Sequence, residues 1–202
     1  MNDKPNLSIY RWYAPFYDLL FGWISAAGRR RAVELLNVRA GERVIIPGVG
    51  TGLDLPLLPS GAIITATDIT PAMLEKARSK ASGRNVKLIR MDAQALQFSD
   101  GSFDAAILNL IVSVAPNGAA AFREAWRVVR SGARVVIFDK FLPEQNQLSP
   151  MRRLIGRIIS TFGTDPNRRL SDIINITPKV IVERNEPSLL RGQYRIVLLR
   201  KG

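Results

Sequence analysis

The chain has 202 residues, which fits one domain of ordinary size, and 47% of them are hydrophobic, enough for a substantial core. It contains no cysteine and no histidine, which excludes disulfides, thiolate or imidazole metal sites, and acid–base catalysis by imidazole. Its net charge of +12 favours an anionic partner such as nucleic acid, anionic lipid or an acidic protein, although an ordinary solvated basic surface would also account for it.

No apolar run approaches the roughly 18 residues that span a bilayer. The first residues also lack the hydrophobic stretch of a signal peptide. We therefore expect a cytoplasmic protein with a single domain over residues 1–202.

The first segment, residues 1–27, is rich in aromatic side chains and is expected to be helical over 9–21. Tyrosine and tryptophan suit an interface with one wet and one oily side. Three arginines follow at 29–31, and aromatic residues beside a basic cluster are what an interfacial membrane anchor needs. The segment is equally suited to be a lid over a cofactor site, and the two roles are compatible. Its aromatic residues are Tyr10, Trp12, Tyr13, Phe16, Tyr17, Phe21 and Trp23.

A glycine-rich turn follows the first predicted strand, 43–47. Gly48, Gly50 and Gly52 let the backbone pass close to a ligand. A short helix expected over 53–57 would direct its free N–H groups toward a carboxylate or phosphate.

The second predicted strand, 62–67, ends at an acid, Asp68. This residue lies twenty positions after Gly48, which is the spacing of a nucleotide-binding βαβ unit. The carboxylate is therefore expected to accept hydrogen bonds from both hydroxyls of a ribose.

Strand-like and helix-like segments alternate along the rest of the chain, which predicts an α/β fold with a mostly parallel sheet. Asn117 is a candidate N-cap for a helix that would stop at Ser131-Gly132. The chain ends in a strand with no helix after it, which suits an antiparallel last strand. The further strands expected are 86–90, 103–109, 133–138, 178–184 and 193–200, and the helices are 24–37, 71–81, 117–130 and 149–162.

The glycine pattern differs from a dinucleotide fingerprint, because its third glycine comes one residue early. G-x-G-x-G before a strand that ends in Asp resembles the S-adenosylmethionine (SAM) site of class I methyltransferases. Residues 91–104, M-D-A-Q-A-L-Q-F-S-D-G-S-F-D, are similar to a stretch of the methyltransferases related to quinone-biosynthesis enzymes. The resemblance covers about residues 9–140. It implies a Rossmann-like fold with seven strands, helices on both faces and an antiparallel last strand.

The resemblance also implies the positions that would hold SAM. The glycine turn, including Thr51, would support the methionine portion, and Asp68 would hold the ribose. Asp92 would accept from the adenine amine, and Asn109 would line the methionine end. The residues expected around the adenine ring are Ile69, Met73 and Ala93.

Residues 10–22, with Val112 to Asn117, resemble the corresponding segments of bacterial phospholipid N-methyltransferases, which methylate phosphatidylethanolamine. One departure is Ile46, which stands where the family usually has Glu or Asp near the SAM amino group. Asp54 and Asn109 are the candidates to replace that acid.

The acceptor amine must lose a proton before it attacks a methyl group. Without histidine, the candidates for this step are Tyr13, Tyr17, Asp18, Asp139 or water. Tyr13 and Tyr17 are expected to orient the amine as part of the lid, because tyrosine hydroxyls and ring faces suit amines and methylated cations. Asp139 ends the fifth strand, where open α/β sheets place their ligands.

A second amphipathic segment, 151–162, groups its arginines on one side and its apolar residues on the other. This pattern suits a helix lying on an anionic membrane surface, such as the inner face of the plasma membrane, and it suits a helix packed on the core equally well.

An RNA methyltransferase is disfavoured, because no N-P-P-Y or D-P-P-Y motif follows the fourth strand. The alternatives to a lipid amine are a quinone-like or other small apolar acceptor, and a non-catalytic SAM- or membrane-binding relative. The sequence leaves the oligomeric state open.

Overall fold

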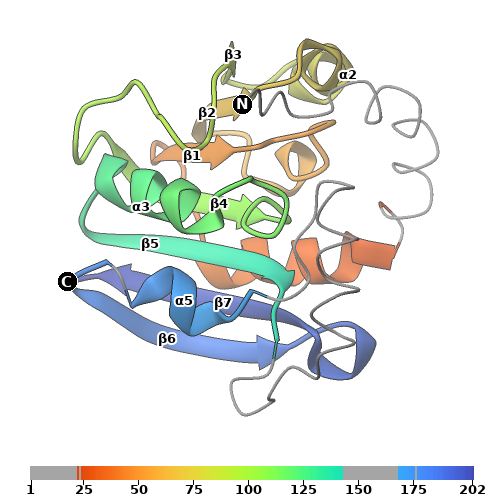
Figure 1. Ribbon diagram of the computed structural model, residues 1–202. Coiled ribbons are helices and arrows are strands. Elements are labelled where there is room, and N and C mark those ends of the chain that lie inside the picture. Colours follow the sequence, from red (N-terminus) through yellow and green to blue (C-terminus); the bar gives the residue numbers. More distant parts are fainter. Residues whose placement is uncertain (1–21, 23, 143–167, 176) are drawn as a thin grey trace, which may run out of the picture.

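The computed structural model describes residues 22, 24–142, 168–175 and 177–202 (Figure 1). In this part of the chain, seven strands form one sheet in the order β3-β2-β1-β4-β5-β7-β6. The strands are β1 (Arg43–Pro47), β2 (Ile63–Asp68), β3 (Val86–Arg90), β4 (Phe103–Asn109), β5 (Val129–Lys140), β6 (Val180–Pro187) and β7 (Tyr194–Lys201). The helical segments are 24–36, η1 (Leu55–Leu57), α2 (Pro71–Ala81), α3 (Gly118–Val128), α5 (Leu170–Ile174) and η2 (Leu190–Gly192).

The last strand lies antiparallel inside an otherwise parallel sheet, as the sequence predicted. β7 pairs antiparallel with β5 on one side and with β6 on the other. The pairs β1–β2, β1–β4, β2–β3 and β4–β5 are all parallel. The carboxyl ends of β1, β2, β4 and β5 therefore meet along one edge, the position where open α/β sheets bind their ligands.

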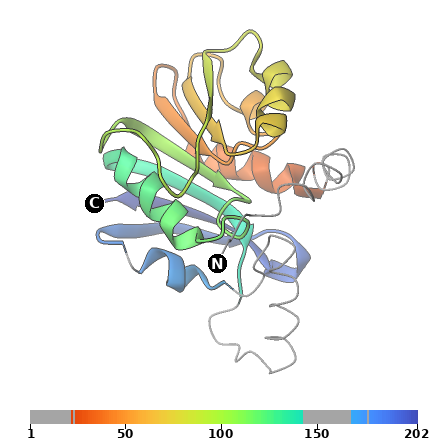
Figure 2. The ribbon, with the colours of Figure 1, turned by 45° about the horizontal axis from the view of Figure 1, so that its top comes forward.

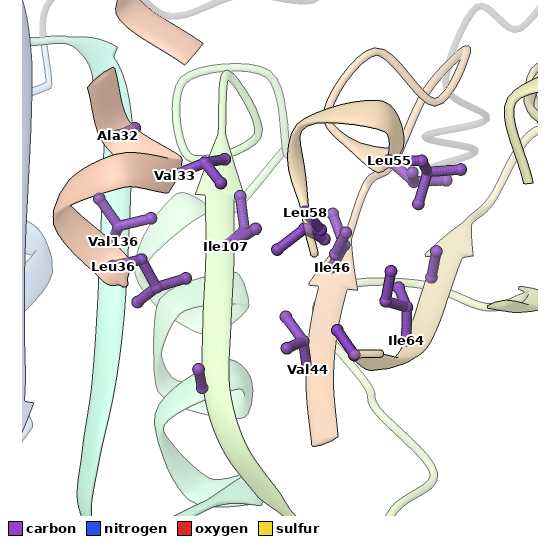
Figure 3. Packing of buried hydrophobic residues seen from close by; sticks show 14 of the residues in the cluster. Ala32, Val33, Leu36, Val44, Ile46, Leu55, Leu58, Ile64, Ile107 and Val136 are labelled. Carbon is purple, nitrogen blue, oxygen red and sulfur yellow. The ribbon is translucent and has the colours of Figure 1, made fainter. Parts of the chain in front are cut away.

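Side chains alternate between the two faces of the sheet, and helices cover both faces (Figure 2). Val44 and Ile46 join the cluster that contains helix 24–36 and part of α2, as the close view of this core shows (Figure 3). Ile45, between them, belongs to the opposite cluster with α3 and α5. Burial on both faces explains why β1 is a continuous apolar run instead of an alternating one.

The structure corrects the end of the predicted helix 117–130. This helix, α3, ends at Val128, and β5 begins at once with Val129. Gly132 has a φ of +75° inside β5, at a register shift against β4. Gly132 is therefore part of an irregularity in the strand and does not end the helix. At the start of α3, the side chain of Asn117 accepts from the Ala120 N–H at 2.9 Å, which confirms the predicted cap.

Two shorter helices also differ from the prediction. The helix expected over 53–57 is a single 3-10 turn, and α5 was not predicted at all. The helices predicted over 9–21 and 149–162 lie outside the described residues. Within the residues that the structure describes, no helix is both long and apolar enough to cross a membrane.

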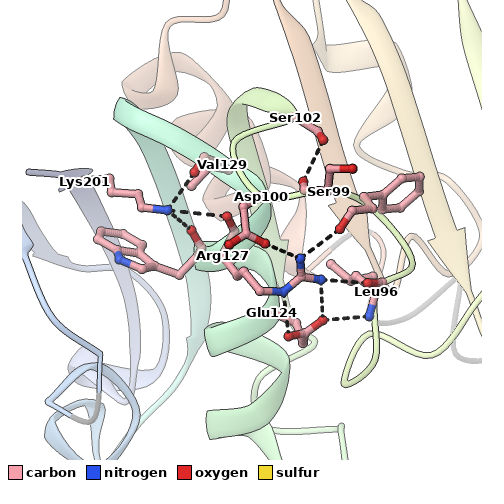
Figure 4. A network of polar contacts seen from close by, with 10 residues as sticks. Leu96, Ser99, Asp100, Ser102, Glu124, Arg127, Val129 and Lys201 are labelled. Atoms are coloured by element: carbon pink, nitrogen blue, oxygen red, sulfur yellow. Dashed lines mark hydrogen bonds and ion pairs between the residues drawn. The ribbon is translucent and has the colours of Figure 1, made fainter.

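One arginine ties the end of α3 to the segment that follows β3 (Figure 4). Arg127 donates to the carbonyl oxygens of Leu96 and Phe98, at 2.7 and 2.8 Å. It also pairs with the carboxylates of Asp100 and Glu124, at 2.6 and 2.8 Å. These bonds hold residues 96–100 against the end of α3.

Candidate active site

The glycine turn forms the floor of the site at the end of β1. Gly48, Gly50 and Gly52 have φ values of +67°, +56° and +81°, a region that favours glycine. A Cβ at Gly48 would collide with Ile111, and one at Gly52 would press on Ala77. A Cβ at Gly50 would meet no atom of the described residues within 4 Å, so this part of the structure leaves the backbone open to a ligand there.

Asp68 couples this turn to the end of β2. Its two carboxylate oxygens accept the backbone N–H groups of Gly50 and Thr70, each at 2.9 Å. Burial raises the pKa of Asp68, and the hydrogen bonds from Thr70 and Gly50 oppose that shift. Because a carboxylate has about four acceptor sites, Asp68 keeps capacity for a ribose hydroxyl.

The residues predicted to surround adenine follow β2 and β3. The Met91 N–H donates to the carbonyl oxygen of Asp68 at 3.1 Å, which brings Asp92 beside β2. Both oxygens of Asp92 accept from the Gln94 side chain, at 3.1 and 3.2 Å. Ala93 is buried, Met73 is partly buried and Ile69 is 43% exposed. Met73 lies in the first turn of α2.

Thr51 is a further predicted cofactor position. It is buried within the glycine turn, and its carbonyl oxygen accepts from the Lys80 Nζ at 2.8 Å. Lys80 thereby anchors the turn to α2.

A buried polar cluster lies on the other side of the turn, at the end of β4. The Asn109 Nδ2 donates to Asp54 Oδ1 at 2.9 Å, and Arg29 donates to Asp54 Oδ2 at 2.8 Å. Asp54 is 2% exposed and Asn109 is 5% exposed. The Asn109 side-chain oxygen, Oδ1, is buried and has no hydrogen-bond partner among the residues that the structure describes.

Arg29 is a site residue that the sequence analysis missed. Residues 29–31 were assigned as a whole to a basic membrane patch, so Arg29 was not considered separately. The structure separates the three, because Arg29 is 13% exposed and pairs with Asp54, whereas Arg31 pairs with Glu186 on the surface. Arg30 is exposed.

Asp139 is fully buried at the end of β5. One oxygen accepts the Ser113 N–H at 2.9 Å and the other accepts the Lys140 N–H at 2.8 Å. Burial raises the pKa of Asp139, and the bonds from Ser113 and Lys140 oppose that shift. This geometry positions the loop after β4, and the catalytic role of Asp139 stays a prediction. The other three candidates for the proton step, Tyr13, Tyr17 and Asp18, lie outside the described residues.

Comparison with known proteins identifies the family. A model described as a methyltransferase domain matches residues 46–137. A phosphatidylethanolamine N-methyltransferase from Cereibacter sphaeroides is 35% identical over 165 residues, which covers 80% of each chain. The chain belongs to the class I SAM-dependent methyltransferases.

Further methyltransferases also resemble the chain. A demethylmenaquinone methyltransferase from Thermus thermophilus is 37% identical over 136 residues, which cover 62% of this chain and 61% of that protein. Among solved structures, a geranyl diphosphate methyltransferase in complex with SAM superposes with a TM-score of 0.69 at 16% identity. That superposition covers 86% of this chain and 85% of the other, and it shows a shared fold.

The cofactor of a SAM-dependent methyltransferase is SAM, and the residues of this site fit it. The open face of Gly50 leaves space for a ligand, and Asp68 offers a carboxylate for a ribose. On the opposite side of β1, the side-chain oxygen of Asn109 offers an acceptor, since it is buried and no described residue donates to it. Ile46, by contrast, is 1% exposed within the apolar core and offers no polar contact.

Proposed function

We propose that this methyltransferase methylates the amine of phosphatidylethanolamine or a related lipid at an anionic membrane surface. The observation that carries the proposal is the likeness to the phosphatidylethanolamine N-methyltransferase, at 35% identity over 80% of both chains. The aromatic segment 10–22 supports it further, since such residues suit a lipid–water interface.

When bound, SAM supplies a methyl group on a sulfonium, which is already an excellent leaving group. The protein therefore mainly positions the two reactants, and positioning contributes several kcal/mol in such reactions. Asp68 holds the ribose, and Asp92 with its neighbours holds the adenine. Tyr13 and Tyr17 orient the lipid amine after its proton has passed to water or to a nearby acid.

The charges that would hold the protein at a membrane are fewer than the sequence suggested. Arg29 and Arg31 are engaged in ion pairs. Arg168 donates to the carbonyl oxygens of Val112 and Pro116. Membrane contact is therefore proposed to depend on Arg30, on the aromatic segment 1–27 and on residues 151–162. Each basic residue near an anionic surface contributes about 1 kcal/mol.

A second candidate is methylation of a quinone-like or other small apolar acceptor. The demethylmenaquinone methyltransferase, at 37% identity, favours it. Both candidates use the same cofactor residues and differ only in the acceptor.

The two are separated by a transfer assay with methyl-labelled SAM. The protein is offered vesicles of phosphatidylethanolamine with phosphatidylglycerol, vesicles in which phosphatidylcholine replaces the phosphatidylglycerol, and a demethylated quinone. Label in methylated phosphatidylethanolamine supports the proposal, and faster transfer in the anionic vesicles supports the membrane role. Label in the quinone alone, or SAM binding without transfer to any acceptor, overturns it. Equal rates in the two kinds of vesicle overturn only the requirement for an anionic surface.

The tyrosine roles are tested separately. A Tyr17→Phe variant should raise KM for the lipid or lower kcat, because it removes the hydroxyl and keeps the ring. Turnover and KM equal to those of the wild type would remove the hydroxyl from the mechanism.

A further inference from the structure

We propose that Arg29 and Asp54 are positioning residues, which hold the Asn109 amide so that its carbonyl oxygen accepts a hydrogen bond from the ammonium group of the cofactor. Asn109, held by Asp54, thereby makes the contact expected of the acid whose position Ile46 occupies. The inference rests on the use of SAM, which the proposed function shares, and it is independent of the acceptor.

The first observation is the unpaired acceptor. Within the described part of the chain, the side-chain oxygen of Asn109 (Oδ1) is buried and has no partner, although buried polar atoms in proteins are nearly always hydrogen-bonded. Leaving such an atom unpaired destabilises the fold. A ligand that donates a hydrogen bond to it would remove this cost.

The second observation is that the orientation of the amide is determined. Its Nδ2 donates to Asp54 Oδ1 at 2.9 Å, and a flipped amide would turn its oxygen toward a carboxylate. Asp54 is held in turn by Arg29 at 2.8 Å, whose Nε donates to the Ser25 hydroxyl at 3.2 Å. The amide nitrogen of Asn109 is thus bound to Asp54, and the amide oxygen is available to accept a hydrogen bond from another donor.

The backbone next to Asn109 is strained. Leu110 has a φ of +59°, in the left-handed region that a leucine rarely adopts. Its N–H donates to the Phe138 carbonyl oxygen at 2.8 Å, which holds this conformation. Strain of this kind persists where the surrounding structure imposes it, often at ligand sites.

The position of the cluster of Arg29, Asp54 and Asn109 indicates which part of the cofactor it would contact. β1 lies between β2, which carries Asp68, and β4, which carries Asn109. A ribose held at Asp68 leaves the amino-acid portion to extend across the glycine turn toward β4. An ammonium group has three donors and no acceptor, so it matches an unpaired carbonyl oxygen beside a carboxylate.

The test compares two ligands by titration calorimetry on wild-type protein and on Asp54→Asn. S-adenosylhomocysteine carries the amino-acid portion, and 5′-methylthioadenosine lacks it. The hydrogen bond from the ligand ammonium to the Asn109 side-chain oxygen involves a charged group. Asp54→Asn, which no longer holds that oxygen in place, should therefore weaken S-adenosylhomocysteine binding about tenfold or more. Binding of 5′-methylthioadenosine should change by less than about twofold, since its contacts lie at Asp68 and beyond. Equal losses for both ligands, or no loss for either, would overturn the inference.

A second measurement needs no variant and decides the matter if Asp54→Asn does not fold. Wild-type protein should bind S-adenosylhomocysteine about tenfold more tightly than the analogue that lacks the amino group. Equal affinities would refute the ammonium contact. Failure of wild-type protein to bind either adenosyl ligand would overturn both this inference and the proposed function. Intact binding without lipid methylation would remove only the lipid acceptor.

Discussion

Asp68→Asn should weaken cofactor binding, because this carboxylate holds the glycine turn and is the residue predicted to bind the ribose. In the wild type, its oxygens accept from Gly50 and Thr70, each at 2.9 Å. An amide keeps one of these bonds and turns an NH2 group toward the other N–H, and it also loses the charge that strengthens a bond to ribose. One hydrogen bond to a charged group contributes about 1.5–3 kcal/mol. We therefore expect S-adenosylhomocysteine to bind about 10–100 times more weakly.

Titration calorimetry with S-adenosylhomocysteine measures this loss, and Asp104→Asn is the matched control. Asp104 also accepts a backbone N–H, that of Arg43 at 2.8 Å, but it lies at the amino end of β4, away from the site. The control should bind the ligand like the wild type. Unchanged affinity in Asp68→Asn, or an equal loss in Asp104→Asn, would refute the assignment of Asp68 to the ribose.

Three further measurements test other parts of the structure. Burial raises the pKa of Asp68, and the ionised carboxylate accepts a hydrogen bond from a hydroxyl more strongly than the protonated acid does. Cofactor affinity should therefore fall as the pH is lowered through this raised pKa, and Asp68→Asn should abolish the dependence. Gly28→Ala should cost about 1–3 kcal/mol in thermal unfolding, because the new Cβ would lie 2.4 Å from the buried Phe138 ring; an unchanged Tm would contradict this packing. Arg127→Met should lower the Tm by about 4–8 °C and speed amide exchange in residues 91–102, because it frees two backbone carbonyls and two carboxylates; exchange unchanged in that segment would show that other contacts hold it.

Local patterns explain which elements were predicted well. The runs that form β1, β2 and β4 are apolar enough to be recognised as buried strands, and Asn117 caps α3 as its residue type suggested. The end of α3 at Val128 was missed because a glycine such as Gly132 can mark either the end of a helix or an irregularity in a strand. Only the pairing of β5 with β4 makes that glycine part of a strand irregularity.

The sequence by itself determined that the glycine turn and Asp68 lie together, because they belong to one βαβ unit with a constant spacing. The cluster of Arg29, Asp54 and Asn109 was decided only by tertiary structure. Its bonds join residues 25 and 55 positions apart, brought together by the packing of helix 24–36 on the sheet and by the pairing of β1 with β4. Side-chain types and local spacing indicate which structure a segment prefers on its own. The partner of a buried charge depends instead on which strands and helices pack together in the folded core.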